Sequence, residues 1–375
     1  MKKYRIDEIT ENLDNLRKPL NNIERSKISK HKLYPYYGAN NIMDYVDQYI
    51  FDEEIICIAE DGGAWGFNEK CSYIVNEKCW VNNHAHVLRA KENLNIQYLS
   101  YYLNYSDLNS KITGTTRGKL TKSALNSIEV LLPSLEKQEM IVEVLNKSQE
   151  LIDKRKVQIE ALDELVKSRF IEMFGDPVSN PMDWKKKRLV DECNIITGNT
   201  PSRKVEEYYG EYIEWIKSDN ITDARIYLTK AKEYLSKEGL KVGRSINENS
   251  ILMTCIAGSI KCIGNVAISN RKVAFNQQIN GIEPLKNNVY FMYQQFNLSQ
   301  KYIQSTINMS LKGILSKGQL SELEFIFPPI EKQNEFAEFF KQTDKLKFEM
   351  QESLRKLEDN FNSLMQRAFK GELFN

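Results

Sequence analysis

The chain has 375 residues, of which 41% are hydrophobic and 27% charged, and its formal net charge is +1. This length is too great for one ordinary core and fits two domains with connecting elements. The composition is that of a globular protein and excludes a disordered or fibrous chain. The small net charge excludes a bulk polycation, so any binding of nucleic acid must come from local basic patches.

No run of residues reaches the roughly 18 to 20 apolar side chains that a membrane span needs, and no apolar segment follows the basic start MKKYRIDEIT. We therefore expect a cytoplasmic protein without a signal peptide. The six cysteines form no CxxC pair, which is typical of reduced, buried thiols. One group has the residue types of a zinc site but not the spacing of a known one, so we predict no metal. That group is Cys71, Cys79, His84 and His86.

In chain order, residues 1–133 form a first block of mixed α and β structure. The run EEIICIAEDGG is typical of a buried strand that ends in a glycine turn, and IQYLSYYLNYSDLNSKI of an aromatic amphipathic helix. A long helix over 134–174 follows, and Gly175 and Pro177 end it. A second block over 178–328 contains the strand-like ENSILMTCIAG, and a second long helix covers 329–371.

Both long helices carry apolar residues at alternating steps of four and three, which is the pattern of a heptad seam. The predicted seam consists of Ile141, Leu145, Ile152, Ile159, Leu162, Val166, Phe336, Phe340, Met350, Leu354, Leu357, Phe361 and Leu364. Each helix would reach about 55 Å. Antiparallel pairing of the two helices would place the two blocks at opposite ends of a rod. The alternative is two separate coiled coils, each pairing with another molecule.

The second half of the chain repeats the first. When the sequence is shifted by 195 residues, 13 of the 55 aligned pairs from Leu120/Leu315 to Phe174/Phe369 are identical. The identical pairs include the run Glu-Lys-Gln at 136–138 and at 331–333. We extend the alignment upstream without a gap to Tyr98/Tyr293 and, with one gap, to the asparagines at 82 and 276. The chain therefore contains one block-plus-helix unit twice.

Motifs of DNA-modifying or DNA-cutting enzymes are absent. The nearest match to a phosphate-binding loop, from Gly114 to Leu120, has one residue too few and no hydroxyl after the lysine. No dinucleotide fingerprint and no Asn-Pro-Pro-aromatic segment is present. Three histidines leave little room for a catalytic or metal triad. We interpret Glu60, Asp61 and Asp219, which resemble nuclease carboxylates, as solvated turn acids.

The sequence resembles the specificity subunits of type I restriction-modification systems. In the second block the resemblance rests on ITGNTPSRKVEEYYG, YIEWIKSDNI, ENSILMTCIAGSI, AFNQQINGIEP and LSKGQLSELEFIFPPIEKQ. In the first block it rests on YPYYGANNIMDYVDQYIFDEEIICIAEDGG, WVNNHAHVLRA and LTKSALNSIEVLLPSLEKQ. These segments cover nearly the whole chain in the family's order, and their combination is far more specific than any one of them.

The resemblance implies an α+β protein with two target-recognition domains separated by two long antiparallel helices. Each domain would read one half of a bipartite, asymmetric DNA target. The helices would set the spacer length and dock two methyltransferase subunits, with two restriction subunits as further partners where the system also cleaves. The chain itself would be a non-catalytic monomer in that complex and would hold no cofactor. S-adenosylmethionine would act in the methyltransferases, and ATP with magnesium in the motor-nuclease, in bacterial or archaeal cytoplasm and in defence against phage.

Candidate DNA contacts are polar, basic or aromatic residues in turns of the two blocks. In the first block they are Tyr36, Tyr37, Asn40, Asn41, Asn83, His84, His86, Arg117, Lys119 and Lys122. In the second they are Thr200, Ser202, Arg203, Lys217, Ser218, Asn220, Gln277, Gln278, Lys312 and Lys317. Lys122 and Lys317 are equivalent in the repeat, which favours phosphate contact or packing over base reading.

Three other functions remain open at the level of sequence. The chain could target a related, type II-like system that recognises a bipartite site. It could be a self-contained nuclease or methyltransferase, which the missing motifs disfavour. It could also be a coiled-coil scaffold without any role in DNA binding.

Overall fold

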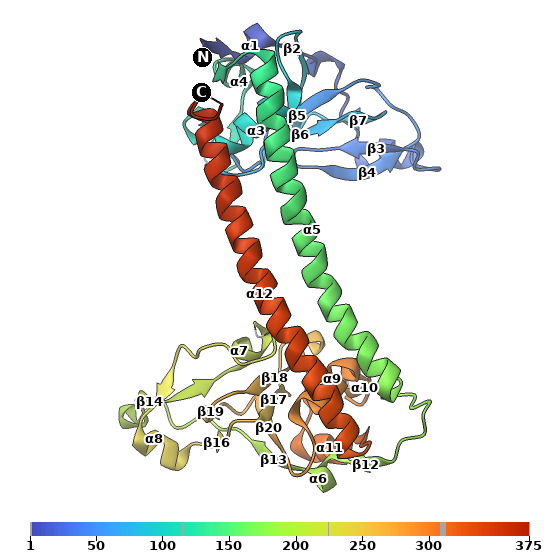
Figure 1. The fold of residues 1–375 in the computed structure, drawn as a ribbon, viewed down its shortest axis with the longest axis vertical. Coiled ribbons are helices and arrows are strands. Elements are labelled where there is room, and N and C mark those ends of the chain that lie inside the picture. Colours follow the sequence, from blue (N-terminus) through green and yellow to red (C-terminus); the bar gives the residue numbers. More distant parts are fainter. Residues whose placement is uncertain (1, 115, 224, 308–312, 375) are drawn as a thin grey trace. The chain divides into compact units, whose positions relative to one another are not determined.

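The structure is a computed structural model that describes residues 2–114, 116–223, 225–307 and 313–374 (Figure 1). It divides into two compact units. Unit 1 contains residues 1–156 and 352–375, and unit 2 contains residues 157–351. The boundary therefore falls inside both long helices, α5 (Leu135–Phe174) and α12 (Ile330–Phe369). The prediction of two mixed α and β domains joined by two long packed helices is confirmed.

Unit 1 is built on a four-stranded antiparallel sheet of order β2-β8-β5-β6 and a three-stranded sheet of order β4-β3-β7, in which β3 and β7 are parallel. The strands of the two sheets are β2 (Thr10–Asn12), β3 (Tyr34–Tyr37), β4 (Ile42–Val46), β5 (Ile55–Ala59), β6 (Ser72–Val75), β7 (Trp80–Val81) and β8 (Ala85–Ala90). Two further pairs are β1 (Lys2–Arg5) with β11 (Glu129–Leu132) and β9 (Ile112–Thr113) with β10 (Lys119–Leu120). The short helices are α1 (Ile6–Ile9), α2 (Asn22–Lys27), α3 (Ile96–Tyr105) and α4 (Lys122–Asn126).

Unit 2 has the same plan, with sheets of order β13-β20-β17-β18 and β15-β14-β19-β16 and with β14 parallel to β19. The strands are β12 (Lys186–Arg188), β13 (Cys193–Thr197), β14 (Tyr209–Ile216), β15 (Tyr234–Leu235), β16 (Ser245–Ile246), β17 (Ser250–Thr254), β18 (Val266–Ser269), β19 (Val273–Phe275), β20 (Ile279–Pro284) and β21 (Glu324–Ile326). The helices are α6 (Leu189–Glu192), α7 (Ser218–Thr222), α8 (Lys237–Val242), α9 (Val289–Leu298), α10 (Gln300–Ser305) and α11 (Lys317–Glu322). Strand β12 pairs with β21, as β1 does with β11.

The repeat is therefore structural, but one detail of the sequence alignment is wrong. The asparagines that cap α3 and α9 are Asn95 and Asn288, so these helices correspond at a shift of 193 residues, not 195. The third residues of the two helices, Tyr98 and Phe291, are both completely buried. The structure thus equates Tyr98 with Phe291, so the shift changes from 193 to 195 residues between these helices and the pair Leu120/Leu315.

Each long helix begins beside its own block, where a buried glutamine fixes it. The side-chain oxygen of Gln138 accepts the backbone N–H of Asn95 at 2.8 Å, and its amide donates to the carbonyl of Pro133 at 3.0 Å. Gln333 is bonded in the same way and accepts the N–H of Asn288 at 2.9 Å. Both glutamines are almost fully buried. They satisfy buried backbone groups, which explains why the Glu-Lys-Gln run has glutamine at both of these positions.

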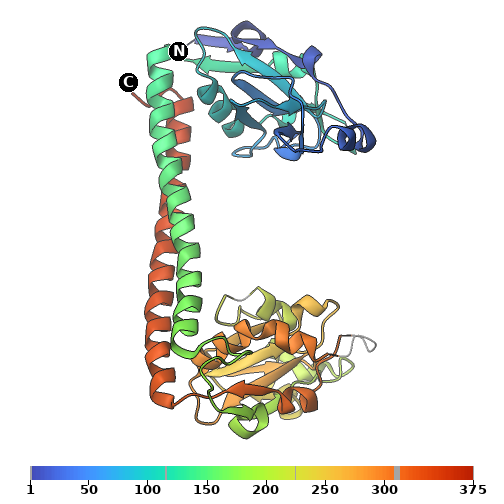
Figure 2. The ribbon, with the colours of Figure 1, turned by 90° about the vertical axis from the view of Figure 1, so that its right-hand side faces the viewer.

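Each long helix ends inside the unit formed by the other block. In unit 2 the ring of Phe174, at the end of α5, lies 4.9 Å from that of Phe291 and 5.9 Å from that of Phe336 on α12. In unit 1 the ring of Phe369, at the end of α12, lies 5.4 Å from that of Tyr98. Within each unit, then, the end of one long helix packs beside the start of the other, and the two run antiparallel (Figures 1 and 2).

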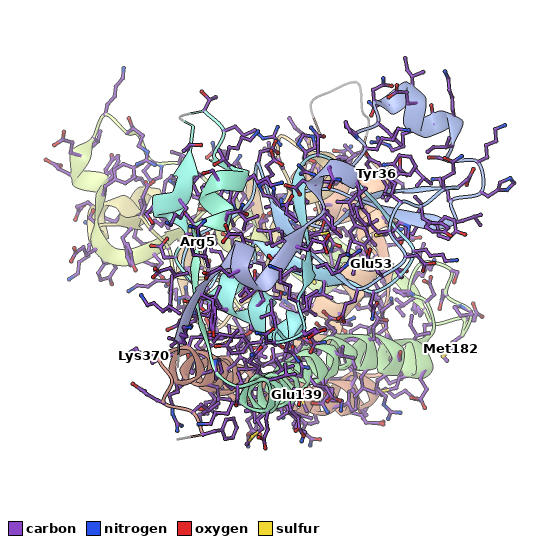
Figure 3. All side chains as sticks on the ribbon, turned by 90° about the horizontal axis from the view of Figure 1, so that it is seen from above. Arg5, Tyr36, Glu53, Glu139, Met182 and Lys370 are labelled. Atoms are coloured by element: carbon purple, nitrogen blue, oxygen red, sulfur yellow. The ribbon has the colours of Figure 1, made fainter. Side chains whose placement is uncertain are left out.

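The thirteen predicted seam residues are all buried or half-buried, and none is exposed. Ile141, Leu145, Phe336 and Phe340 also belong to the cores of the two units. On the other side of unit 1, the helix α5 presents exposed side chains such as Glu139, away from Tyr36 of strand β3 (Figure 3). Packing of α5 on α12 within one chain disfavours the alternative of two separate intermolecular coiled coils.

Replacing Gln333 by leucine should destabilise unit 2. The change leaves the N–H of Asn288 and the carbonyl of Pro328 buried without partners. We expect the free energy of unfolding to fall by about 2–4 kcal/mol, measured by denaturant titration of the full chain. The control Gln342→Leu, at an exposed position of the same helix, should change it by less than about 0.5 kcal/mol. Equal effects of the two substitutions would show that the buried bonds contribute nothing.

Candidate nucleic-acid interface

Three loops meet at one edge of the sheets of unit 1. The loop after β3 contacts the loop after β7, where the N–H of Asn82 donates to the carbonyl of Tyr37 at 3.1 Å. The loop after β5 joins them, because the N–H of Glu60 donates to the carbonyl of His84 at 2.9 Å and Asn40 donates to Gly62 at 3.2 Å. This edge brings together six predicted contacts. They are Asn40, Asn41, Asn83, His84, Arg117 and Lys119.

Asp61 lies at the centre of this edge and holds two of these residues. Its carboxylate lies 2.9 and 3.0 Å from Nδ1 of His84 and 2.8 Å from a guanidinium nitrogen of Arg117. Gly62 follows with φ of +65°, and a Cβ there would lie 3.1 Å from the same guanidinium. The backbone conformation therefore favours glycine at this position.

Glu60 pairs with cations on the inner side of the same loop. It accepts from Arg17 at 2.7 Å and lies 3.0 Å from Nζ of Lys119. Burial by itself raises the pKa of Glu60, but the hydrogen bonds from Arg17 and Lys119 outweigh it and lower the pKa below its ordinary value. Behind this pair, His86 is bonded to Asp14 at 2.6 Å and to the carbonyl of Leu120 at 2.7 Å.

Stability of unit 1 should depend on Glu60 in a pH-dependent way. Because its pKa is lowered on folding, its contribution is present at neutral pH and is lost as the pH falls through the folded value. We expect Glu60→Gln to cost about 1.5–3 kcal/mol at pH 7 and progressively less below about pH 4.3. Denaturant titrations at pH 7 and pH 4 measure this. Glu54→Gln, at an exposed residue of the same unit, serves as the control. If the wild type and Glu60→Gln differ in free energy of unfolding by as much at pH 4 as at pH 7, the role of the carboxylate is contradicted.

Unit 2 has an equivalent edge. The N–H of Asn276 donates to the carbonyl of Ile216 at 3.0 Å, as that of Asn82 does to Tyr37 in unit 1. The loop after β13 joins this edge, because Asn199 donates to Phe275 at 3.1 Å and the hydroxyl of Thr200 donates to the side chain of Gln277. The equivalent edges of the two units therefore carry different side chains on the same backbone arrangement.

The basic residues of this second edge are ordered by aromatic rings and one acid. The guanidinium of Arg203 lies 4.5 Å from the ring centroid of Tyr209 and 5.0 Å from that of Trp215. Glu233 pairs with Arg203 at 2.6 Å and accepts a hydrogen bond from Lys217. Hydrogen bonding from Lys217, followed by Arg203, lowers the pKa of Glu233 despite its partial burial. The group presents an oriented guanidinium at the protein surface.

Four of the predicted DNA contacts are instead buried and form hydrogen bonds within the protein. Tyr36 and Tyr37 are buried, and their hydroxyls bond to the N–H of Leu20 and to Glu77. His86 is buried and bonded through both ring nitrogens. Asn220 is buried and bonded to the backbone of residues 217 and 230. These side chains support the interface from behind and offer DNA little surface.

The remaining predicted contacts are distributed as follows. Ser202 is exposed, and Ser218 and Gln278 are half-buried near the second edge. Lys122 and Lys317 are the exposed first residues of α4 and α11. Lys312 lies outside the described residues.

The sequence interpretation missed the acids and one arginine. Glu60 and Asp61 are not solvated turn acids, because both are largely buried in ion pairs, with side-chain exposures of 14% and 20%. Their place after a buried strand and before a glycine turn was the available signal. Arg17 is distant in sequence from every other member of the edge, and Glu233 stands in a charged loop without a motif. Only the fold brings them into the site.

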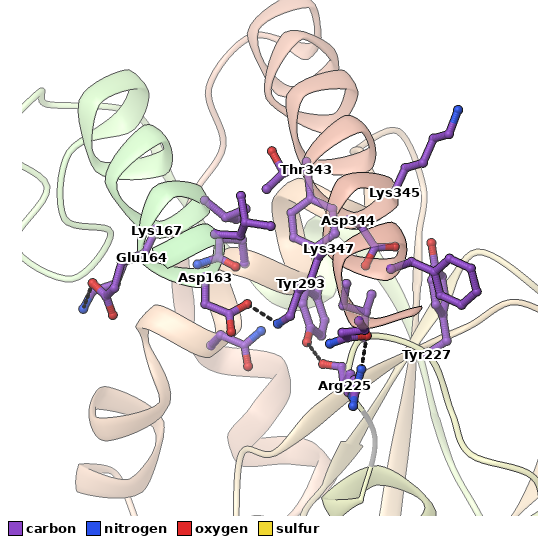
Figure 4. Close-up of a pocket in the computed structure, with 18 of the residues that line it drawn as sticks. Asp163, Glu164, Lys167, Arg225, Tyr227, Tyr293, Thr343, Asp344, Lys345 and Lys347 are labelled. Carbon is purple, nitrogen blue, oxygen red and sulfur yellow. Dashed lines mark hydrogen bonds and ion pairs between the residues drawn. The ribbon is translucent and has the colours of Figure 1, made fainter. Parts of the chain in front are cut away.

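Unit 2 also contains a pocket of about 1210 Å³ between α5, α12 and the loop that precedes β15 (Figure 4). Lys347 of α12 donates to Asp163 of α5 across it, and the hydroxyl of Tyr293 donates to the carbonyl of Arg225 at 2.6 Å. Burial, together with the charge of Asp163, raises the pKa of Asp344, which the charge of Lys347 only partly offsets. The pocket mixes charged and aromatic side chains and has no single chemical preference.

Replacing Asp344 by asparagine should stabilise unit 2 at neutral pH. A carboxyl whose pKa is raised on folding weakens the fold when ionised, and this penalty disappears when the group is protonated. Because the side chain is half-exposed, we expect a gain below about 1 kcal/mol at pH 7 that vanishes below about pH 3.9. Thermal denaturation at pH 7 and pH 4 tests this, and a lower melting temperature for the variant at pH 7 would contradict it.

Among the described residues, no three or more His, Cys, Asp or Glu side chains are placed to hold a metal ion. Cys71 and Cys79 belong to different hydrophobic cores, and burial raises the pKa of each thiol to about 12. In the described part of the chain, no helix combines the length and the apolar character that crossing a membrane requires.

Comparison with known proteins gives a consistent result. The family model described as "Type I restriction modification DNA specificity domain" matches residues 1–161 and 181–358. A putative type I restriction enzyme specificity subunit of Haemophilus influenzae is 40% identical over 141 residues, which is 38% of this chain and 35% of that protein. The StySPI specificity subunit of Salmonella potsdam is 20% identical over 94% of this chain and 81% of its own length.

The fold also matches a solved structure. The crystal structure of a type I restriction-modification S subunit from M. genitalium covers 98% of this chain and 96% of its own, with a TM-score of 0.61 at 14% identity. At this identity the likeness concerns the fold alone. The alignments with the Haemophilus relative and with the MjaIX specificity subunit of Methanocaldococcus jannaschii span only 35% and 37% of those proteins.

Proposed function

Because the chain belongs to the family of type I restriction-modification DNA specificity domains, we propose that it is the DNA specificity subunit of such a system. Each block reads one half of a bipartite, asymmetric duplex target. The observation that carries this proposal is the pair of equivalent sheet edges. They share a backbone arrangement but differ in side chains, as two unlike half-sites require.

The division of contacts follows from the chemistry of the two edges. In unit 1, Asn40, Asn41 and Asn83 offer exposed amides, which suit adenine edges, and Arg117 offers a guanidinium. In unit 2, Arg203 is pre-oriented for a guanine edge or a phosphate. Lys122 and Lys317, at equivalent places in the repeat, are assigned to phosphates, which fix position without reading sequence.

The proposal assigns no catalysis to this chain. The long helices set the spacer between the half-sites and dock two methyltransferase subunits, which use S-adenosylmethionine. Two restriction subunits that use ATP and magnesium join where the system also cleaves. Exposed apolar side chains of α5, such as Leu151 and Leu165, support the docking role.

Substitutions in one unit should relax only one half of the target. We would express the chain with its methyltransferase in a methylation-free host and map methylated bases by sequencing. The wild type should give one bipartite motif. Arg203→Ala should reduce selectivity about 10- to 100-fold at positions in one half, and Arg117→Ala at positions in the other, because each removes one base-edge donor.

Glu248→Gln, at an exposed residue that precedes β17 and lies away from the interface, is the control and should leave the motif unchanged. A continuous motif in the wild type, or relaxation of both halves by Arg203→Ala alone, would contradict the assignment of one half-site to each unit.

A further inference from the structure

We infer that Glu233 and Asp61 are specificity-determining residues, because each occupies two basic side chains that DNA must take over when it binds. This inference rests on the proposed function. The two carboxylates would act through the basic side chains that they hold, not by contact with DNA. Each unit has one such acid at the centre of its edge. The two acids stand on different loops and have different partners, so they are not explained by the repeat.

In unit 2 the cations are already oriented before DNA arrives. Arg203 is held against the rings of Tyr209 and Trp215, and Lys217 lies 5.2 Å from the ring of Trp215. Their shared partner is Glu233, whose lowered pKa keeps it ionised at neutral pH. A phosphate oxygen and a carboxylate oxygen make the same kind of hydrogen bond with a guanidinium. Glu233 therefore competes with phosphate for the donors of Arg203.

In unit 1 the same competition involves a different pair. Asp61 accepts from Nδ1 of His84 and from Arg117, whose side chain is 62% exposed while that of Asp61 is only 20% exposed. The cation is thus accessible to DNA from outside, and its partner is fixed behind it. Any duplex that binds Arg117 must either share it with Asp61 or break that pair.

The physical consequence is a cost in binding free energy that affects mainly duplexes without the target sequence. A duplex of arbitrary sequence offers phosphates, which are repelled by the carboxylate and must displace it from its cations. A matching duplex adds base-edge hydrogen bonds that compensate for the displaced ion pair. The two acids therefore lower non-specific affinity more than specific affinity and raise the ratio between them, which governs recognition in a genome.

The experiment measures binding of the full chain to a random-sequence 30-base-pair duplex by fluorescence anisotropy over a series of salt concentrations. We expect Glu233→Gln and Asp61→Asn each to tighten binding about five- to tenfold at 0.1 M salt, the equivalent of one freed charge pair. Glu248→Gln and Glu54→Gln remove the same charge at exposed residues that precede β17 and β5, away from the interface. These controls should tighten binding less than twofold.

A second set of variants separates the local pair from a general change in charge or folding. In an Arg203→Ala, Lys217→Ala background, Glu233→Gln should change affinity no more than Glu248→Gln does, because the cations it held are gone. Circular dichroism and melting temperature establish that each variant is folded. Tightening of the same size in that background, or no difference between the carboxylate variants and their controls, would overturn the inference while leaving the proposed function intact. If neither the wild type nor any variant bound duplex even at low salt, the proposed function would fall, and the inference with it.

Discussion

The burial of each long helix's C-terminal end within the unit built on the other block is the interaction on which the structure depends. Phe174 and Phe369 are equivalent in the repeat, yet each completes the core of the block that does not immediately precede its helix. Truncation of a buried aromatic ring of this kind typically costs about 3–5 kcal/mol. Neither half of the sequence can therefore complete its own core, and the two halves form two units only together.

The interface inherits its geometry from this core. Gln138 and Gln333 fix the start of each long helix to the capped ends of α3 and α9. Those helices cover sheets whose strands end in the loops of the candidate interface. Because the parallel pairs β3–β7 and β14–β19 end at the same edge, their loops meet without any motif that links them in sequence. The scaffold is repeated, and the loops are free to differ.

That freedom is visible in the chemistry of the two edges. One presents amides, a histidine and an arginine around Asp61, and the other an arginine stacked on Tyr209 and Trp215 beside Glu233. Both edges neutralise their own cations with an acid, which agrees with a net charge of only +1 in a protein proposed to bind DNA. Local pairing, rather than a basic surface, is how this chain combines solubility with selective binding.

The sequence by itself determined the repeat, the two long helices and the residues of their seam, because a heptad pattern and an ungapped alignment are local signals that survive without a structure. It also singled out Asn40, Asn83, Arg117, Arg203 and Gln277 as candidate contacts in turns, and the structure shows that they lie at the two edges. Only the tertiary structure decided that Tyr36 and His86 are internal and that Phe174 belongs to the second unit. It alone brought Arg17, Asp61 and Glu233 into the site. The reason is physical: burial and ion pairing depend on which strands and loops become neighbours, and that is set by contacts between residues far apart in the chain.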